Sequence, residues 1–203
     1  MTFLKKLSKL FHSMGVFGLI RLTLDLIYSK ILFPKARILR RPFYIRNEGK
    51  LIIGTGFSCG PGLIIDVFGE NAKVEIGQNV MAYHNLHIGA IESVVIGDRV
   101  LIASGVYISD HGHGKYSGEI QSNPLVPPVE RTLTGASVKI GDDVWIGERV
   151  AILPGVSIGK GVILGAGAVV TSSLPDYVIA IGVPAKVVKV FDFEKNKWMS
   201  AQI

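Results

Sequence analysis

Residues 140–175 read IGDDVW IGERVA ILPGVS IGKGVI LGAGAV VTSSLP, six consecutive hexads in one register. An aliphatic residue opens every hexad: Ile140, Ile146, Ile152, Ile158, Leu164 and Val170. The fifth positions are also apolar: Val144, Val150, Val156, Val162, Ala168 and Leu174. Six hexads in register are hard to obtain by chance, so this repeat decides the fold class.

The same pattern occurs upstream, where residues 53–70, 76–93 and 96–113 each hold three hexads. Three hexads fit one turn of a triangular coil, with the first residue of each hexad pointing inward and a small or turn-forming residue at each corner. Stacked coils pair their strands in parallel and bury ladders of Ile and Val. The sequence therefore predicts an all-β fold, a parallel β-helix over residues 51–189. An αβ fold would need helical periodicity, which is absent between about residues 50 and 180.

Three segments depart from the repeat. Residues 1–50 are expected to form a basic, amphipathic helical arm, and residues 190–203 a tail that packs back on the last coil as a short helix. Residues 114–139 form an excursion that contains Pro124, Pro127, Pro128 and Gly135. Loops of this length inside a compact domain are usually functional, so the excursion is expected to have a role beyond connecting two coils.

Positive charge is concentrated in the arm. Residues 1–50 hold 11 Lys and Arg against Asp25 and Glu48, a balance of +9, whereas the rest of the chain has a balance of −3. A basic arm can bind nucleic acid, but apolar residues at helical spacing favour an anionic membrane surface, so we expect no nucleic acid partner. The arm is expected to cap the first coil, to contact a bilayer through residues 1–40, or to do both. Arg21, Asp25 and Lys30 interrupt its apolar run and argue against a membrane span.

Cys59 is the one cysteine of the chain, so an internal disulfide is excluded. This fits a reducing compartment, and with no secretory signal expected at the N-terminus we predict a cytoplasmic protein, peripheral to the inner face of the membrane if the arm binds lipid. Cys59 occupies an inward first position of a hexad, which predicts a small buried side chain and no reactive role.

Several motifs carry a resemblance to a known family. VWIG at 144–147, ILPGV at 152–156, GAGAVV at 165–170 and AIGVPAKVV at 180–188 resemble the hexapeptide-repeat acyltransferases, over roughly residues 50–190. The coils of that family wind left-handed, an exception to the right-handed rule for parallel crossovers. The chain is most similar to the sugar O-acetyltransferases of surface-polysaccharide and lipopolysaccharide assembly. The resemblance implies a left-handed β-helix, a homotrimer, acetyl-CoA as donor, a sugar or glycan acceptor that is lipid-linked or free, and no required metal.

Acyl transfer to a sugar hydroxyl needs a base, because such hydroxyls are very weak acids, and imidazole suits this role near neutral pH. Ser109-Asp110-His111-Gly112-His113 stands where the repeat gives way to the excursion. An ungapped match to the family motif puts the catalytic histidine on His113, with His111 as the competitor. Asp110 either orients an imidazole or makes a turn.

The resemblance also suggests acceptor and donor residues. Tyr83 stands where the family often has a polar acceptor contact, Asn85 is nearby, and His87 either faces the acceptor pocket or lies on the surface. In the family's donor site, the position of Trp145 forms a wall by the pantetheine arm, and the N–H groups of Gly147 and Glu148 correspond to those at the thioester carbonyl. Positions beside the pantetheine correspond to Ala166, Gly167, Thr171 and Ser172. Positions near the phosphates correspond to Lys186 and Lys189. Trp145 as a surface cover and the lysines as solvated groups are the alternatives.

Two rival functions remain open at this point. One is a zinc enzyme similar to the γ-type carbonic anhydrases, with ligands drawn from His84, His87, His111 and His113 across a subunit interface. The spacing of these histidines is not that family's, and Trp145 with the intact C-terminal hexads favours the acyltransferase. The other rival is a non-catalytic scaffold, which leaves the histidine pair and the excursion unexplained.

Overall fold

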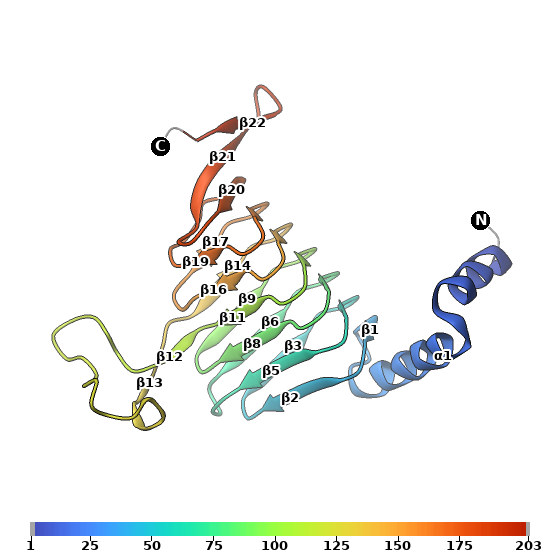
Figure 1. Ribbon diagram of the computed structural model, residues 1–203, viewed down its shortest axis with the longest axis horizontal. Helices are drawn as coiled ribbons and strands as arrows, with labels where there is room; N and C mark the ends of the chain where they lie inside the picture. Colours follow the sequence, from blue (N-terminus) through green and yellow to red (C-terminus); the bar gives the residue numbers. More distant parts are fainter. Residues whose placement is uncertain (1–2, 202–203) are drawn as a thin grey trace.

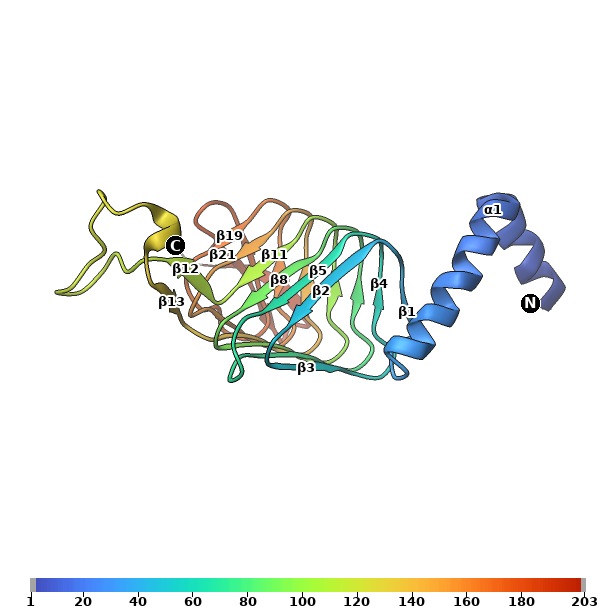
Figure 2. The same ribbon diagram turned by 90° about the horizontal axis from the view of Figure 1, so that it is seen from below.

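The computed structural model describes residues 3–201, with side chains described from residue 12 onward, and it is a parallel β-helix preceded by one helix, α1 (Phe3–Leu32). Three sheets form the sides of a triangular prism, as Figures 1 and 2 show. We name them sheets A, B and C in the order in which the chain visits them. A fourth sheet, which contains only β12 and β13, lies outside the prism.

Within each sheet the parallel strands come from successive coils, and β21 and β22 extend sheet A as antiparallel strands. Sheet A contains β1 (Ile38–Leu39), β4 (Ser58–Cys59), β7 (Met81–Ala82), β10 (Leu101–Ile102), β15 (Trp145–Ile146), β18 (Ile163–Leu164), β20 (Val178–Ile181), β21 (Lys186–Asp192) and β22 (Lys197–Ser200). Sheet B contains β2 (Phe43–Asn47), β5 (Leu63–Val67), β8 (His87–Ala90), β11 (Tyr107–Ser109), β16 (Ala151–Ile152) and β19 (Val169–Val170). Sheet C contains β3 (Lys50–Ile53), β6 (Lys73–Ile76), β9 (Ser93–Ile96), β14 (Val138–Ile140) and β17 (Ser157–Ile158).

The hexad pattern predicted the core correctly. Every first-position and fifth-position residue of the six hexads from Ile140 to Pro175 is buried inside the prism. In the first five of these hexads the fourth position makes the corner with a positive φ, which is why it is Gly155, Gly161 or Gly167 in three of them. Asp143 and Arg149 adopt the same left-handed conformation without glycine, at φ 59° and 54°. Cys59 is also buried, and burial raises the pKa of its thiol to about 12, in agreement with its predicted inert role.

Helix α1 ends at Leu32, and the second part of the helix packs against the first coil. Gly15, at φ 63° and ψ −177°, breaks the helical backbone, so α1 has two segments. The buried carboxylate of Asp25 lies 2.7 Å from Arg41 Nε, and Ser29 Oγ accepts the Leu39 N–H at 2.7 Å. This contact is the expected cap on the open end of the stack.

The stack begins earlier than expected. Strands β1 and β2 pair with β4 and β5, so residues 38–47 belong to the first coil although the pattern suggested an arm as far as residue 50. Among the described residues, α1 included, no helix combines the length and the apolar character needed to cross a bilayer.

The C-terminal tail differs from its prediction. Strand β21 turns back antiparallel on β20, and β22 pairs antiparallel with β21, so residues 186–200 form a hairpin and not a helix. The β-branched and aromatic residues Val187, Val188, Val190 and Phe191 favour a strand, and Asn196 at φ 51° makes the tight turn. The hairpin extends beyond the last coil at the opposite end of the stack from α1 (Figure 1).

Candidate active site

The two candidate histidines lie on a short antiparallel ribbon at the corner between sheets B and C. Strand β11 ends at Ser109, and the chain then leaves the prism as β12 (His111–His113), which pairs with β13 (Leu133–Gly135) before β14 resumes the stack. The excursion between β12 and β13 protrudes from the side of the prism (Figure 2). Because both histidines are within paired strands, the ribbon fixes their backbone relative to the coils.

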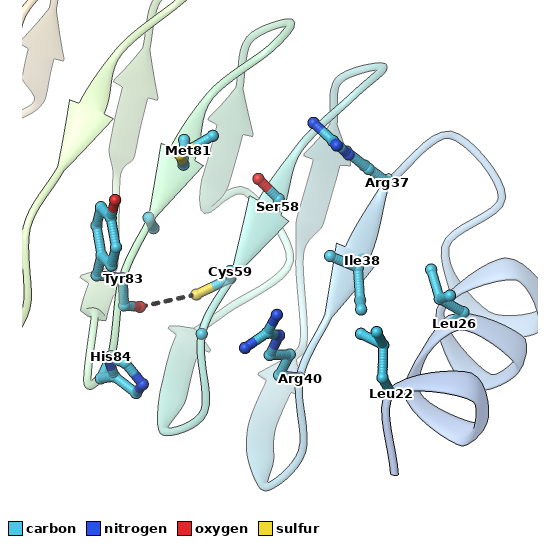
Figure 3. Close-up of a pocket in the computed structure, with 12 residues that line it drawn as sticks. Leu22, Leu26, Arg37, Ile38, Arg40, Ser58, Cys59, Met81, Tyr83 and His84 are labelled. Atoms are coloured by element: carbon cyan, nitrogen blue, oxygen red, sulfur yellow. Dashed lines mark hydrogen bonds between the residues drawn. The ribbon is translucent and has the colours of Figure 1, made fainter. Parts of the chain in front are cut away.

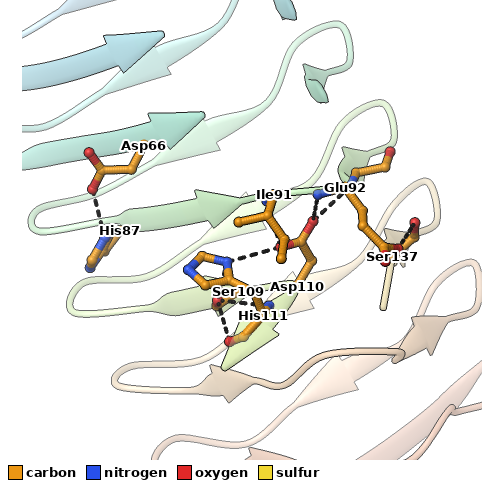
Figure 4. A network of polar contacts seen from close by, with 9 residues as sticks. Asp66, His87, Ile91, Glu92, Ser109, Asp110, His111 and Ser137 are labelled. Atoms are coloured by element: carbon orange, nitrogen blue, oxygen red, sulfur yellow. Dashed lines mark hydrogen bonds and ion pairs between the residues drawn. The ribbon is translucent and has the colours of Figure 1, made fainter. Parts of the chain in front are cut away.

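Asp110 is the fixed negative charge of this corner. Its side chain is 0 % exposed, and its carboxylate accepts the N–H groups of Ile91, Glu92 and Ser93 at 2.7–2.9 Å (Figure 4). Burial acts to raise its pKa, but the hydrogen bond with His111 and those from the three N–H groups outweigh burial and hold the pKa of Asp110 below its ordinary value. Asp110 therefore both makes the turn and contacts an imidazole.

His111 is held by that carboxylate. Its Nδ1 lies 3.0 Å from Asp110 Oδ1 and 3.3 Å from Ser109 Oγ, and its side chain is 14 % exposed. A carboxylate can only accept, so Nδ1 carries the proton and Nε2 keeps the lone pair. The ring of Phe68 meets the imidazole edge-on, with ring centroids 6.0 Å apart. His111 is thus an oriented but largely enclosed imidazole.

His113 is exposed and is oriented by the excursion. Its Nδ1 lies 3.2 Å from the Pro128 carbonyl oxygen, at the start of the short 3₁₀ helix Pro128–Glu130. A carbonyl oxygen only accepts, so Nδ1 again carries the proton and the lone pair is on Nε2. The Tyr116 hydroxyl donates to the His113 carbonyl, and Arg131 donates to the Tyr116 hydroxyl at 2.8 Å. The excursion therefore fixes the tautomer of His113 and leaves its basic nitrogen accessible.

His87 lies on the outer face of sheet B, one coil before Tyr107. Its Nε2 is 3.4 Å from Asp66 Oδ2, and its ring meets that of Tyr107 with centroids 5.3 Å apart. Arg46 Nε lies 3.2 Å from the other carboxylate oxygen of Asp66. Figure 4 shows His87 and His111 as separate clusters, each with its own aspartate.

The candidate donor residues begin on a different corner, between sheets A and B. Trp145 projects from β15 with half of its side chain exposed, Glu148 is exposed at the corner that follows, and Ala166 and Gly167 occupy the same corner one coil later. Tyr83 and Asn85 also lie on this corner, following β7. Asn85 is in the left-handed region at φ 56°, so its backbone serves the turn.

The remaining donor candidates are spread around the last coil and the hairpin. Thr171 and Ser172 are exposed and follow β19, at the corner between sheets B and C. Lys186 and Lys189 are exposed on β21, which pairs with β20 in sheet A. Thr171 and Ser172 are therefore on a different corner from Trp145, and the two lysines are three strands away from Trp145 in sheet A.

Gly147 corrects one expectation. Its N–H donates to the Leu164 carbonyl at 2.9 Å, so it is engaged between coils and is not available to a thioester. A Cβ at Gly147 would stand 2.6 Å from that carbonyl oxygen, so the glycine is required by close packing of the coils.

Comparison with known proteins identifies the family. The families described as bacterial transferase hexapeptide (six repeats) and hexapeptide repeat of succinyl-transferase match residues 137–172 and 88–110. The putative lipopolysaccharide biosynthesis O-acetyl transferase WbbJ of Escherichia coli K12 is 42 % identical over 194 residues, which are 95 % of this chain and 98 % of the relative. The chain belongs to the hexapeptide-repeat acetyltransferases.

Two solved structures extend the likeness of this acetyltransferase to three dimensions. Galactoside acetyltransferase in complex with coenzyme A is 31 % identical with a TM-score of 0.54, over 75 % of this chain and 68 % of that one. AntD, an N-acyltransferase from Bacillus cereus in complex with dTDP-4-amino-4,6-dideoxyglucose and coenzyme A, is 25 % identical with a TM-score of 0.67, over 83 % and 90 % of the two chains.

We call β12 and β13 the histidine ribbon, and the corner between sheets A and B that carries Glu148 the donor corner. In one protomer of the acetyltransferase they lie at opposite edges of sheet B. Strand β16 joins the two edges, because it begins at Ala151, three residues after Glu148, and its neighbour β11 ends at Ser109, next to Asp110. Pro154 holds the position on its coil that Asp110 holds on the preceding coil, because each stands two residues after a paired isoleucine, Ile152 or Ile108. Pro154 is six residues after Glu148, which corresponds to up to about 20 Å of extended chain. The structure therefore does not bring the two predicted sets together within one chain.

Sequence reasoning missed the partners that orient the imidazoles. Nothing in the pattern linked Pro128 to His113 or Asp66 to His87, because these contacts depend on the path of the excursion and on the offset between coils. The inward-outward alternation of IIDV in β5 was the one available signal for Asp66. Within residues 3–201, no group of three or more His, Cys, Asp and Glu side chains is arranged to hold a metal ion.

Proposed function

We propose that this acetyltransferase moves an acetyl group from acetyl-CoA to a sugar hydroxyl during assembly of lipopolysaccharide or another surface polysaccharide. The observation that carries the proposal is the likeness to WbbJ over nearly the full length of both chains. The coenzyme A held by galactoside acetyltransferase and by AntD supports the donor, and the sugar nucleotide held by AntD supports a sugar acceptor.

His113 is the proposed general base. Its exposed Nε2 takes the proton of the sugar hydroxyl as the oxygen attacks the acetyl carbonyl, while the Nδ1–H stays on the Pro128 carbonyl. The tetrahedral intermediate then expels the coenzyme A thiolate, and the imidazolium returns the proton to that sulfur. The acetyl ester and the free thiol are the products, with no covalent enzyme intermediate.

On the donor side, Trp145 covers the pantetheine arm and the Glu148 N–H faces the developing oxyanion. Ala166, Gly167, Thr171 and Ser172 follow the pantetheine along the coils, and Lys186 and Lys189 neutralise phosphate charge. Gly147 contributes the close coil packing that positions Glu148. Tyr83, Asn85 and His87 contact the acceptor, and Asp66 orients His87 for that purpose.

The site is completed by a second chain in this proposal. Because the histidine ribbon and the donor corner lie at opposite edges of sheet B, a hydroxyl at His113 reaches a thioester at Glu148 when the corner of one protomer lies against the ribbon of another. A cyclic trimer gives three equivalent sites of this kind.

Substitution of the two histidines tests the mechanism. We expect His113→Ala to lower kcat by about 10²–10⁴-fold with coenzyme A affinity unchanged, and His111→Ala to lower kcat by about tenfold, since His111 is mostly enclosed. Purified protein is assayed with acetyl-CoA and candidate glycans by thiol release and product mass, and acetyl-CoA binding is measured separately. A dead His111→Ala beside a near-normal His113→Ala would reverse the assignment.

We also propose that α1 brings the enzyme to an anionic bilayer. Asp25 and Ser29 face the first coil, whereas exposed apolar residues recur every three or four positions on the other side of the helix: Phe17, Ile20, Leu24, Ile27 and Ile31. The +9 balance of residues 1–50 adds electrostatic attraction. The side chains of Leu4, Leu7, Leu10 and Phe11, which suggested this role, lie outside the described side chains.

Liposome flotation tests the membrane proposal. The full chain is expected to float with vesicles that contain anionic lipid and to be released by salt, because each basic residue near the surface contributes about 1 kcal/mol at low ionic strength. The variant Phe17→Ser with Ile31→Ser keeps every charge and should float much less. Equal flotation of the two proteins, or flotation with neutral vesicles alone, contradicts the proposal.

A further inference from the structure

A groove of about 430 Å³ lies between the second segment of α1 and the outer face of sheet A. Figure 3 shows its walls. Leu22 and Leu26 of the helix form one side, Ile38 and Met81 lie on the floor, and Tyr83 and His84 stand at the far end. Apolar side chains make up most of the lining, Ser58 adds a hydroxyl, and Arg37 and Arg40 add positive charge.

No acidic side chain among the described residues pairs with Arg37 or Arg40. Among the described residues, neither guanidinium makes an ion pair or a side-chain hydrogen bond, although Arg40 is half-buried. Two neighbouring arginines behave differently, because Arg41 pairs with Asp25 and Arg46 with Asp66. A half-buried guanidinium loses hydration without compensation unless an anion binds, and its planar fork matches phosphate oxygens.

The groove leads to the donor corner. The Arg40 N–H donates to the Cys59 carbonyl, Gly60 to Ala82, and Tyr83 to Ile102, so Arg40, Gly60 and Tyr83 form one column on the corner between sheets A and B. The same column continues through Ala103 to Gly147, next to Glu148. Coils are about 4.8 Å apart, which puts Arg40 about 10 Å from Tyr83 and Tyr83 about 10 Å from the donor corner.

We propose that this groove binds the phosphate or diphosphate group of an acceptor sugar, with Arg37 and Arg40 as its ligands. The inference rests on the proposed function, and it names the acceptor class as a sugar carried on phosphate. With its phosphate at the arginines, the sugar ring extends along the column to Tyr83, toward the thioester. A lipid carrier and a nucleotide carrier share this phosphate chemistry, and the apolar wall of Leu22 and Leu26 gives the lipid carrier additional contact.

Direct binding separates this inference from the acetyl transfer. Inorganic pyrophosphate, uridine diphosphate and farnesyl diphosphate are titrated into the full-length protein at 0.15 M salt, about the physiological ionic strength, by calorimetry. Arg37→Gln with Arg40→Gln is expected to weaken all three ligands by about tenfold or more, since charge-assisted bonds to two guanidinium groups are lost. Lys139→Gln, an exposed basic residue on sheet C, is the matched control and should bind as the wild type does.

The carrier is distinguished by a second variant. Leu26→Ser should weaken farnesyl diphosphate but not pyrophosphate if the carrier is a lipid, and should leave both unchanged if it is a nucleotide. Circular dichroism checks folding, and unpaired arginines predict no loss of stability on substitution. Pyrophosphate binding that is absent in the wild type, or equal in wild type and double variant, overturns the inference. Loss of binding in the double variant without any acetyl transfer by the wild type would sustain the groove and refute the proposed function.

Discussion

Asp110 joins three structural roles in one carboxylate. It ties the strand end at Ser109 to the backbone of the preceding coil, holds His111, and precedes the ribbon that carries His113. The sequence suggested that Asp110 either makes a turn or orients an imidazole. It does both, because each carboxylate oxygen has more than one lone pair and can accept more than one hydrogen bond. The buried charge is stable because four hydrogen bonds replace its hydration.

Asp110→Asn is expected to destabilise the protein most at neutral pH. The folded-state pKa of Asp110 is lowered, so its stabilisation is complete above the unfolded pKa near 3.8 and is lost as the pH falls through the lower folded pKa. Asparagine brings an NH₂ group toward backbone donors, which should cost about 1–3 kcal/mol. Urea unfolding at pH 7 and at pH values below 4 measures the gap, which should shrink in acid.

The matched control is Glu119→Gln, an exposed carboxylate of the excursion without a hydrogen bond or ion pair among the described residues. Its unfolding midpoint should follow that of the wild type at every pH. A gap for Asp110→Asn that persists unchanged below pH 4 would mean that the carboxylate charge is not the source of the stabilisation.

The sequence indicates candidate site residues, but it does not indicate the contacts that these residues make. The hexads located His111 and His113 at an edge of the repeat, since a break in a strict period is visible in one dimension. The tautomers could not be read from the pattern, because they depend on Pro128 and Asp110, which the fold brings to each ring. The N–H of Gly147 was wrongly expected to be free, because a period does not reveal which backbone groups pair between coils.

At the scale of elements, the two ends of the stack were predicted less well than its middle. Residues 38–47 form β1 and β2 without an I-G-x-x-V hexad, and Leu39, Phe43 and Ile45 supply the apolar contacts that Ile and Val make elsewhere. An end coil has one neighbour in place of two, so its inward positions also meet α1 and tolerate larger side chains. The hexad pattern therefore does not predict the first coil, which has no I-G-x-x-V hexad.

The C-terminal hairpin is expected to depend on Trp198. Its ring meets Phe191 edge-on with centroids 5.2 Å apart, and Phe191 continues through Phe193 to Tyr177 on the last coil. Trp198→Ala removes the outer member of this cluster and should lower stability by about 1–3 kcal/mol, less than for a fully buried tryptophan. Thermal unfolding and limited proteolysis of the hairpin measure the effect, with the exposed Met199→Ala as control. Equal melting and cleavage of the two variants would contradict the packing role.

At the scale of the molecule, the three outer faces of the prism differ in character. Beyond the groove beside α1, where Ser58 stands between Ile38 and Met81, the outward column of sheet A is apolar: Leu101, Trp145, Ile163 and Ile179. The corresponding column of sheet C passes through Ile52, Glu75, Val95, Lys139 and Ser157, so three of its five positions are polar. An exposed apolar column on a rigid face is typical of contact with another chain, whereas the polar face of sheet C fits solvent.

This asymmetry predicts a homotrimer with sheet C outermost. Sedimentation equilibrium at micromolar concentration should report three 21.9 kDa chains. Leu101→Arg puts a charge on the apolar column and should yield monomers that retain the β-helix spectrum by circular dichroism but have lost activity. Lys139→Glu, on the polar face, should remain trimeric. A wild-type monomer with full activity is the result that contradicts both the trimer and the shared site.

Mixing two inactive variants tests the division of the site between chains. His113→Ala removes the proposed base, and Ala166→Phe introduces a bulky side chain at the exposed corner on the expected pantetheine path. Each homotrimer should be inactive.

If every site takes the ribbon of one chain and the corner of its neighbour, co-refolded 1:1 mixtures contain sites with both parts intact. These sites are about a quarter of the total for random assembly in a cyclic trimer. If each site lies within one chain, no intact site can form and the mixture stays inactive. Activity that appears only after subunit exchange, and reaches this fraction of the wild-type value, therefore distinguishes the two arrangements without any assumption about the acceptor.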